Sequence, residues 1–336
     1  MEITIKKRAM LFPGTSNPEL AKEIADHLGM RLEEVEITRF ASSETKVRFP
    51  ESVRGADAFV IQTHCAPIND MIMEQLIMID ALKRASAKRI NAVIPYYGYG
   101  RQDRKALARE PISARLIADL LSVAGADRVL SVDLHTGQIQ GFFDIPVDHL
   151  TALPLLADYI AGKYGDDLVV VSPDAGGANL ADKYARHLKA SVAFAQKRRR
   201  PDRPNVTETI GLVGEVEGKR CVIVDEMIDT GGSLVGAAHL LLERGASEVM
   251  AAATHAVFAG NALLKLAESP LKEVVVTNTL PVPRDHGVQK ITVISIAPIV
   301  ASTIRAVFED ESVSEIFHGE HLDYIPPEYQ EPRDNP

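Results

Sequence analysis

Apolar and polar residues alternate in blocks that predict strands and helices in turn along most of the chain. Short apolar runs rich in β-branched residues, at 58–62, 128–132 and 168–172, have the length of buried parallel strands. Longer segments with an apolar stripe at helical spacing, at 69–85 and 178–189, predict amphipathic helices. Regular alternation of strand and helix is typical of an α/β protein with parallel sheets.

The series of elements restarts near residue 150, where a helix at 151–163 precedes the strand at 168–172. We therefore expect an α/β fold of two similar doubly wound parallel-sheet domains with right-handed crossovers. Ligands of such sheets bind at the carboxyl ends of the strands. The expected divisions are 1–150, 151–310 and a C-terminal segment at 311–336, whose acidic and proline-rich end we expect to be disordered.

Composition and charge exclude several classes of function. The 336-residue chain has a formal net charge of −9 and no tryptophan, which argues against a nucleic-acid surface. Its two cysteines, Cys65 and Cys221, lie far apart without metal-ligand spacing and suit a reducing compartment. We find no leader sequence and no apolar run of about 18 residues. We therefore expect a soluble cytoplasmic protein with no nucleic-acid or membrane partner.

The stretch from Cys221 to Ser233, CVIVDEMIDTGGS, combines a buried strand, a short loop and the start of a helix. Glycines let a backbone curl around an anion, and the first amides of a helix are unpaired and partly positive. Carboxylates at Asp225 and Glu226 could accept hydrogen bonds from the hydroxyls of a sugar whose phosphate lies in the loop. A phosphorylated pentose fits this stretch, although an ordinary glycine-rich turn with solvated acids would look alike. The stretch has neither the lysine of a Walker loop nor the GxGxxG spacing of dinucleotide sites.

Two basic segments follow predicted strands. The loop YYGYGRQDRK, at 96–105, places aromatic and basic side chains together, as single-stranded nucleic-acid sites do. The acidic charge of the chain argues against that interpretation. The segment QKRRRPDRPN, at 196–205, has the composition of a nuclear-localisation or nucleic-acid patch. Its prolines and charges also suit a mobile loop that an anion orders.

Three polar features at turns or strand ends could serve either a functional or a purely structural role. His135 follows the strand at 128–132, and a lone histidine is often a satisfied structural group. Asp174 begins a second glycine-rich turn, in which an aspartate commonly forms the turn itself. The segment around Phe40 alternates apolar and charged residues, as a plain surface hairpin does.

The motifs, in their order along residues 9–317, resemble those of class I ribose-phosphate diphosphokinases, enzymes of the phosphoribosyltransferase fold. The matching stretches are RFASSE, RQDRK, DLHTGQIQGFFDIPVDH, SPDAGG, QKRRRPDRPN and VDEMIDTGGS. The resemblance implies transfer of the β,γ-diphosphoryl group of ATP to the 1-hydroxyl of ribose 5-phosphate. The products would be AMP and 5-phosphoribosyl 1-diphosphate, and no covalent enzyme intermediate is needed.

The resemblance also assigns site residues. Catalytic roles fall to Lys197 and Arg199. Ribose 5-phosphate contacts fall to Arg199, Asp225, Glu226, Asp229, Thr230, Gly231, Gly232 and Ser233. ATP contacts fall to Phe40, Ser42, Ser43, Glu44, Arg101, Gln102 and Asp103, with Phe40 and Glu44 completing the ATP site of a neighbouring subunit. Magnesium ligation falls to His135 and Asp174, with Asp133 close by.

The implied cofactor is Mg²⁺, as two ions, and the implied partners are ATP, ribose 5-phosphate and further copies of the chain in a homohexamer built from dimers. The segment ESVSEIF resembles a family segment linked to phosphate and ADP, with Glu315 in place of the usual tyrosine, so inorganic phosphate is an expected activator. Two rival functions remain open. A phosphoribosyltransferase that consumes the product would not need the ATP motifs, and a non-catalytic associated subunit would have lost residues such as Lys197 and His135.

Overall fold

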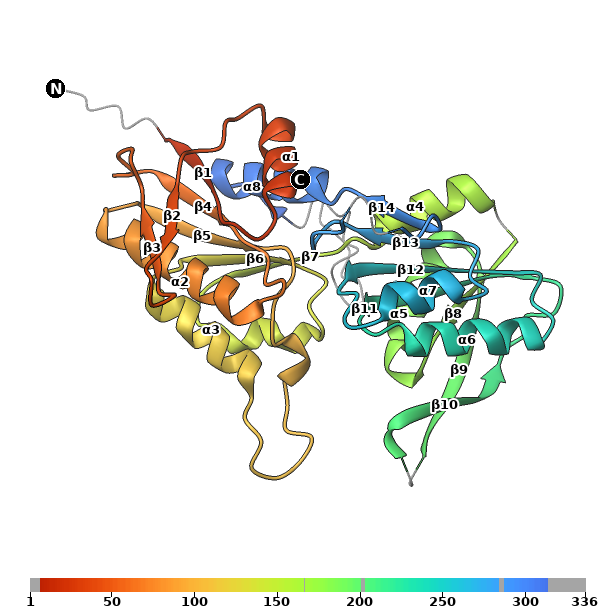
Figure 1. The fold of residues 1–336 in the computed structure, drawn as a ribbon. Coiled ribbons are helices and arrows are strands. Elements are labelled where there is room, and N and C mark those ends of the chain that lie inside the picture. The colour runs from red at the N-terminus through yellow and green to blue at the C-terminus, as the bar shows by residue number, and fades with distance from the viewer. Residues whose placement is uncertain (1–6, 166, 201–202, 284–286, 314–336) are drawn as a thin grey trace, which may run out of the picture.

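A computed structural model of the chain describes residues 7–165, 167–200, 203–283 and 287–313, and the side chains of 196–210 lie outside that description. The described chain forms two α/β halves, each built on a parallel sheet, that lie side by side (Figure 1). This confirms the α/β class that the pattern of strands and helices predicts. No helix in these ranges is both long and apolar enough to cross a bilayer.

The first half has a five-stranded sheet in the order β1-β4-β5-β6-β7, in which neighbouring strands are parallel. Its strands are β1 (Ala9–Pro13), β4 (Asp57–Ile61), β5 (Arg89–Ile94), β6 (Arg128–Val132) and β7 (Val147–Leu150). Its helices are α1 (Pro18–Leu28), α2 (Ile68–Arg84) and α3 (Ser113–Ala124), with the 3-10 turns η1 (Gly100–Gln102) and η2 (Gly137–Phe142). A separate antiparallel hairpin comprises β2 (Glu36–Arg39) and β3 (Thr45–Arg48).

The second half has a seven-stranded sheet in the order β10-β9-β8-β11-β12-β13-β14, in which β10 is antiparallel to β9 and the other pairs are parallel. Its strands are β8 (Leu168–Ser172), β9 (Ser191–Arg200), β10 (Arg203–Val213), β11 (Arg220–Ile228), β12 (Glu248–Ala256), β13 (Val274–Thr277) and β14 (Ile291–Ile294). Its helices are α4 (Leu153–Tyr164), α5 (Ala178–Leu188), α6 (Gly232–Glu243), α7 (Ala262–Glu268) and α8 (Ala297–Glu309), with the turn η3 (Ala175–Gly177).

The strand order of the second sheet reverses between β8 and β11. The chain winds outward from β8 to β9 and β10, and then returns to β11 on the other side of β8. At such a reversal, the loops that leave the carboxyl ends of the two strands diverge and leave room for a ligand. The loops after β8 and β11 are the two glycine-rich turns singled out in the sequence.

Helices cover both faces of both sheets, because residues of each strand alternate between two cores. In the first sheet, Phe12, Val60 and their neighbours pack with α2 and α3, whereas Leu11 and Phe59 face a second core. That second core also takes in buried residues of α1, α4, α5 and α8 and of the second sheet. One continuous apolar core therefore runs through both halves, and a third core lies under α6 and α7.

Helix α8 packs against α1 although it follows the second sheet in the sequence, as Figure 1 shows. Asp310, at the end of α8, binds Lys7 and also Arg89, whose Nη1 lies 2.6 Å from the carboxylate. Arg89 in turn forms two hydrogen bonds with the buried Asp57. A domain boundary at residue 150 therefore leaves the last helix on the surface of the first half.

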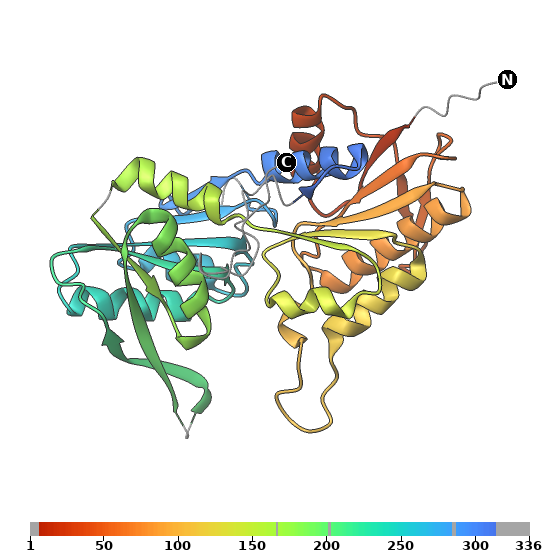
Figure 2. The same cartoon turned by 180° about the vertical axis from the view of Figure 1, so that it is seen from behind.

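Several elements differ from the sequence prediction. The basic segment after residue 195 is not a loop: β9 continues to Arg200 and pairs with β10, whose stretch VTETI has strong β propensity. Strand β11 continues through Asp225 and Glu226, because its backbone pairs with β12 as far as Ile228. The short elements β7 and α7 were not expected. Figure 2 shows the β9–β10 hairpin extending to the same side of the molecule as the loop between η1 and α3.

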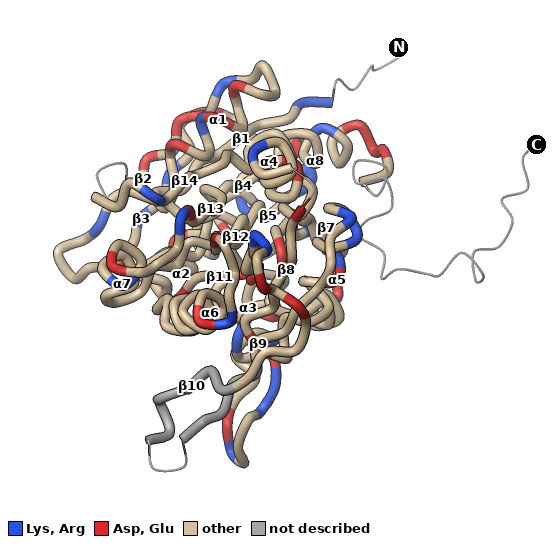
Figure 3. Tube along the Cα trace, turned by 90° about the vertical axis from the view of Figure 1, so that its right-hand side faces the viewer, with Lys and Arg blue, Asp and Glu red and all other residues tan. Residues whose placement is uncertain are grey.

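Charges are mixed along the chain. In Figure 3, Lys and Arg are interspersed with Asp and Glu along the described trace of both halves. The predicted disordered tail from His318 lies outside the described residues.

Glu273, next to β13, is the buried charge that ties α4 to the second sheet. Its carboxylate accepts hydrogen bonds from Lys163 (2.7 Å), Thr292 (2.6 Å) and Tyr159 (2.8 Å), and from Tyr164. Burial raises the pKa of this carboxyl, but these hydrogen bonds outweigh burial and lower the pKa to about 2. An ionised group with a lowered pKa stabilises the folded state above its ordinary pKa, and the contribution is lost as the pH falls toward the folded value.

We predict that Glu273→Gln lowers the free energy of unfolding by about 3 kcal/mol at pH 7, and by clearly less at pH 3. Urea unfolding at the two pH values measures the difference, with the exposed Glu243→Gln as the control. An equal loss at both pH values would show that the charge of Glu273 contributes nothing.

Candidate functional site

The predicted phosphate loop lies at the carboxyl end of β11. Gly231 has φ +72°, a left-handed conformation that suits glycine, and α6 begins at Gly232 without a side-chain cap. The first amides of α6 are therefore available to an anion, and the helix dipole favours negative charge there. This geometry is that of the strand, loop and helix start predicted from the sequence.

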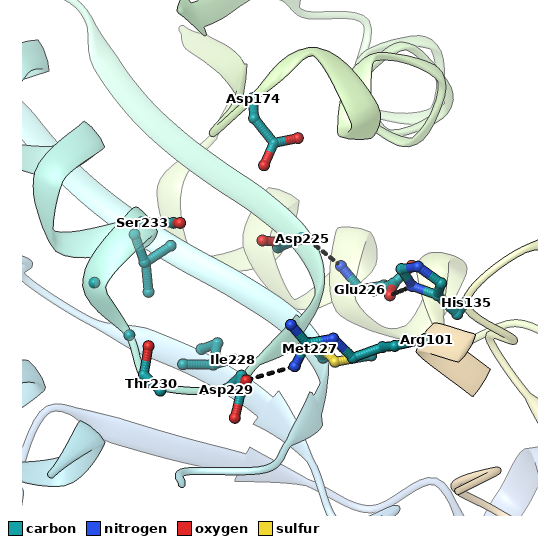
Figure 4. A pocket seen from close by; sticks show the side chains of 13 residues that line it. Arg101, His135, Asp174, Asp225, Glu226, Met227, Ile228, Asp229, Thr230 and Ser233 are labelled. Atoms are coloured by element: carbon teal, nitrogen blue, oxygen red, sulfur yellow. Dashed lines mark hydrogen bonds and ion pairs between the residues drawn. The ribbon is translucent and has the colours of Figure 1, made fainter. Parts of the chain in front are cut away.

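A cavity of about 250 Å³ lies over this loop, and we call it the central cavity. It takes Arg101 and His135 from the first half and its other lining from the second half (Figure 4). The predicted residues that line it are Arg101, His135, Asp174, Asp225, Glu226, Asp229, Thr230, Gly231, Gly232 and Ser233. The structure thus brings together residues that are up to 132 positions apart in the sequence, from 101 to 233.

Two ion pairs cross from one half to the other inside this cavity. Arg101 Nη1 lies 2.5 Å from Asp229 Oδ2, which joins a predicted ATP residue to the predicted sugar-phosphate loop. His135 Nδ1 contacts Glu226 Oε1, and Figure 4 shows both pairs. The hydrogen bond with Glu226 raises the pKa of the His135 imidazole, because the carboxylate favours the charged ring.

Asp174 forms its turn and also lines the cavity. Its Oδ1 accepts hydrogen bonds from the backbone amides of Gly176 (2.9 Å) and Gly177 (3.3 Å). The turn-forming explanation of this aspartate is therefore correct, and it is compatible with a role in the site. Figure 4 shows the Asp174 carboxylate across the cavity from the loop at Asp229.

Potential metal ligands are sparse. Among the described residues, no three His, Cys, Asp or Glu side chains gather in a group that could hold a metal ion by themselves. Asp133 does not line the central cavity. Its Oδ2 instead accepts hydrogen bonds from Thr254 Oγ1 (2.6 Å) and the amide of Ala152 (3.0 Å). The metal role that the family resemblance suggests for Asp133 stays a prediction, and the contacts of its Oδ2 are with the second half of the molecule.

A larger cavity of about 930 Å³ adjoins the central cavity and shares Arg101 and Asp229 with it. Gln102 also lines it, and Gln102 Oε1 accepts a hydrogen bond from Ser113 at 2.6 Å. The third residue of this motif, Asp103, is buried and accepts a hydrogen bond from Thr136 Oγ1 at 2.8 Å. Asp103 thus ties the turn η1 to the segment that follows β6.

The predicted ATP residues from Phe40 to Glu44 lie on the tip of the β2–β3 hairpin and line neither cavity. Phe40 is exposed, Ser43 has φ +74°, and Ser42 Oγ donates to Glu44 Oε2 at 2.6 Å. The hairpin thus contributes no side chain to the cavities of its own subunit.

Lys197 and Arg199 lie on β9, opposite residues 209 and 207 of β10. Their side chains are outside the described part of the structure, as is the whole of Glu315. Positions two apart on a strand share one face, so 197 and 199 alternate with 198 and 200. Their catalytic roles and the role of Glu315 stay predictions.

Sequence reasoning missed several buried polar residues where the two halves meet. Thr254 and His255 lie near the end of the alanine-rich strand β12, and Thr279 follows β13. Burial lowers the pKa of His255, so the ring is neutral at pH 7. The only signal in the sequence is a polar pair at the end of an apolar strand, which does not identify its partner.

Comparisons with known proteins identify the family of the chain. Residues 9–125 match the family model described as the N-terminal domain of ribose phosphate pyrophosphokinase, and residues 196–318 match the phosphoribosyl synthetase-associated domain. The ribose-phosphate pyrophosphokinase of Clostridium acetobutylicum is 54% identical over 316 residues, which are 94% of this chain and 98% of that protein. The enzyme of Bacillus subtilis is 50% identical over 311 residues, 93% of this chain and 98% of its own.

A solved structure of a related protein has the same fold as this chain. The crystal structure of phosphoribosylpyrophosphate synthetase from Mycobacterium smegmatis superposes with a TM-score of 0.86 at 54% identity. The match covers 90% of this chain and 100% of that one. With both halves of the sequence, the order of the motifs and the fold in agreement, the chain belongs to the ribose-phosphate pyrophosphokinase family.

Proposed function

We propose that the chain catalyses the transfer of the β,γ-diphosphoryl group of ATP to the 1-hydroxyl of ribose 5-phosphate, giving AMP and 5-phosphoribosyl 1-diphosphate. The observation that carries this proposal is the central cavity. There, a glycine loop suited to a sugar phosphate lies beside Arg101 of the other half. Arg101 Nη1 is 2.5 Å from Asp229 Oδ2 of the loop. Acceptor and donor sites thus adjoin each other, as a direct transfer requires.

The two cavities suit the two substrates in size. The central cavity has the volume and the anion-binding loop for a pentose phosphate, and Asp225 and Glu226 line it where the sugar hydroxyls would lie. The adjoining cavity of about 930 Å³ is within the size range of nucleotide-sized ligand sites. We propose that ATP binds with its phosphates toward Arg101, whose planar fork suits phosphate oxygens.

Catalysis in this arrangement is positioning and charge stabilisation. The backbone amides at the start of α6 hold the 5-phosphate, and Arg101 orients the triphosphate. Lys197 and Arg199, on the hairpin beside β8, neutralise charge on the transferring group. The attacking 1-hydroxyl displaces AMP from the β-phosphorus, and no protein nucleophile is needed.

Magnesium is the cofactor that we propose for this site. Mg²⁺ is commonly held by one or two carboxylates together with substrate phosphates and water, so a small set of protein ligands fits it. Asp174 and His135, which both line the cavity, are the candidates, and His135 would contact the ion directly or through water. When bound, the ion offsets the negative charge of the phosphates.

Two rival functions can be separated by one assay. Release of AMP from ATP that depends on ribose 5-phosphate supports the proposal. A phosphoribosyltransferase would consume 5-phosphoribosyl 1-diphosphate without ATP, and a non-catalytic subunit would do neither. The two free cysteines suit a reducing compartment, so we also propose a cytoplasmic location.

We predict that Gly231→Ala raises the KM for ribose 5-phosphate at least about tenfold and changes the KM for ATP little. Space is not the obstacle, because an added Cβ would meet its nearest neighbour at 3.9 Å. The obstacle is φ +72°, which costs a residue with a side chain about 1–2 kcal/mol and shifts the loop. Steady-state kinetics with each substrate varied measures the effect.

Gly29→Ala is the matched control for this prediction. Gly29 has φ +65° with open space around it, and it ends α1 far from the cavity. It should lose similar stability and keep both KM values. If Gly231→Ala raises the KM for ATP as much as the KM for ribose 5-phosphate, the loop does not bind the sugar phosphate specifically.

We predict that Lys197→Ala lowers kcat by about 10³ or more with modest changes in KM, because the charge acts on the transferring group rather than on bound substrate. Arg198→Ala, the neighbouring position on the other face of the strand, is the control and should keep kcat within about threefold. If Lys197→Ala raises the KM for ATP and leaves kcat intact, the lysine serves ground-state binding only.

We also propose that the chain self-associates, in line with the homohexamer built from dimers that the family resemblance implies. Helix α3 exposes an apolar stripe at helical spacing, formed by Ile112, Leu116, Leu120 and Val123. An exposed apolar stripe of this kind is typical of an interface between subunits. Phe40 and Glu44, which line neither cavity of their own subunit, would then complete the site of a neighbour.

We predict that Leu116→Glu dissociates the assembly and lowers activity in proportion. Leu116 is 56% exposed, so the substitution should leave the fold of a single subunit intact. Leu264→Glu, at a 58% exposed position on α7, is the matched control and should stay assembled. Sedimentation velocity gives the mass of each variant. A wild-type chain that is fully active as a monomer would refute the proposal.

A further inference from the structure

Asp133, the residue after β6, has an unusual backbone. Its φ is +37°, in the left-handed region that residues with side chains seldom adopt. Aspartate tolerates this region better than most residues, but the conformation persists only where the surroundings fix it. The amide of Asp133 donates to Leu150 O at 2.8 Å, which continues the pairing of β6 with β7 past the strand end.

Both the side chain and the carbonyl of Asp133 are held by the other half of the molecule. Oδ2 accepts from Thr254 Oγ1 at 2.6 Å, and the carbonyl oxygen lies 3.0 Å from His255 Nε2. Thr254 and His255 are consecutive residues near the end of β12, and both are buried. The same Oδ2 accepts from the amide of Ala152 at 3.0 Å. One carboxylate oxygen thus joins β6, the start of α4 and β12.

The histidine in this arrangement is itself fixed. A carbonyl oxygen only accepts, so His255 Nε2 carries the proton, and Nδ1 is free to accept from Thr279 Oγ1 at 2.9 Å. The ring of Tyr96 packs edge-on against His255 with centroids 4.9 Å apart. His255 therefore has one tautomer and one orientation, and it holds the carbonyl of Asp133 in place.

The next two residues connect this anchor to the central cavity. The amide of Leu134 donates to His149 Nε2 at 2.9 Å. His135 then extends to Glu226 at the cavity. Each residue from 133 to 135 is thus fixed by a group outside its own segment, and the only one of the three that lines the cavity is His135.

We propose that Asp133 is a positioning residue, which acts as a hydrogen-bond acceptor for Thr254 and Ala152 and thereby aims His135 into the cavity. This role differs from metal ligation, because Oδ2 already accepts from two donors and Asp133 is not among the residues that line the cavity. The inference rests on the proposed function in one respect, since it assigns His135 to the magnesium side of that site.

The decisive variant is Thr254→Val, which keeps the shape of the side chain and removes the hydroxyl donor. We expect kcat to fall about tenfold and the Mg²⁺ concentration for half-maximal rate to rise about tenfold, the usual size of effects of residues behind a metal ligand. The KM for ribose 5-phosphate should stay within about twofold. Thr254→Ser, which restores the donor, should behave as wild type.

Thr303→Val is the matched control. Thr303 is 0% exposed and Thr254 3%, and Thr303 donates within α8 to Ile299 O, away from Asp133. The same change of a buried threonine should lower the melting temperature without altering the Mg²⁺ dependence. If Thr303→Val shifts the Mg²⁺ dependence as strongly as Thr254→Val, the effect is one of general stability and the proposal is wrong.

Substitution of Asp133 itself separates the two roles. Asn tolerates a left-handed φ and keeps an acceptor oxygen, so Asp133→Asn should keep kcat within about threefold, whereas Asp133→Ala should lose about tenfold or more. A metal ligand would lose its charge in both variants. Loss of activity in Asp133→Asn as severe as in Asp133→Ala would therefore overturn the proposal.

A crystal structure of Thr254→Val provides a readout that does not depend on activity. We expect the His135 side chain to leave Glu226 or to occupy two conformers. If wild type releases no AMP and His135 still moves in the variant, the proposed function fails and the positioning role stands. An unmoved His135 in a variant with normal Mg²⁺ dependence would exclude the role.

Discussion

A buried polar seam between the two sheets is the constraint on which the site depends. We define the seam as the buried residues Thr63, Thr254, His255 and Thr279 together with the half-buried Asp133. Thr63 Oγ1 donates to Thr279 O at 2.7 Å, and Asp133 is bound by the pair on β12. An apolar core would stabilise many relative positions of the halves, because burial is not directional. Buried polar groups are costly unless paired, so the seam permits one arrangement.

The Arg101–Asp229 ion pair in the central cavity contributes little to holding the halves together. Arg101 is 58% exposed, and an exposed ion pair contributes about 0–1 kcal/mol. Breaking the Arg101–Asp229 contact when phosphates bind therefore costs little, and the same charges are then available to the substrates. The seam supplies rigidity where no ligand binds, and the cavity keeps weak contacts where ligands do bind.

Local patterns in the sequence predict the local structure well. The loop at Asp229 and the helix after it follow from glycines placed between apolar runs, and α5 (Ala178–Leu188) matches the helix predicted at 178–189 to within one residue. The hairpin of β9 and β10 was missed because a run of charges hides the strand pattern. The seam could not be predicted, because Asp133 and Thr254 are 121 residues apart and no sequence motif indicates that they form a contact.

The carboxyl edges of the sheets both join the two halves of the molecule and form the central cavity. Different residues serve these two purposes. On the first sheet, two residues of the same segment divide these purposes. Asp133 belongs to the seam, and His135, two residues later, lines the cavity. On the second sheet the division follows the strands, because β12 and β13 supply the seam, whereas β8 and β11 flank the reversal of strand order and supply the cavity. Direct transfer of a group between two bound substrates depends mainly on how precisely the substrates are positioned. A rigid seam beside an adaptable cavity suits this reaction, because the seam fixes the two halves that hold the substrates.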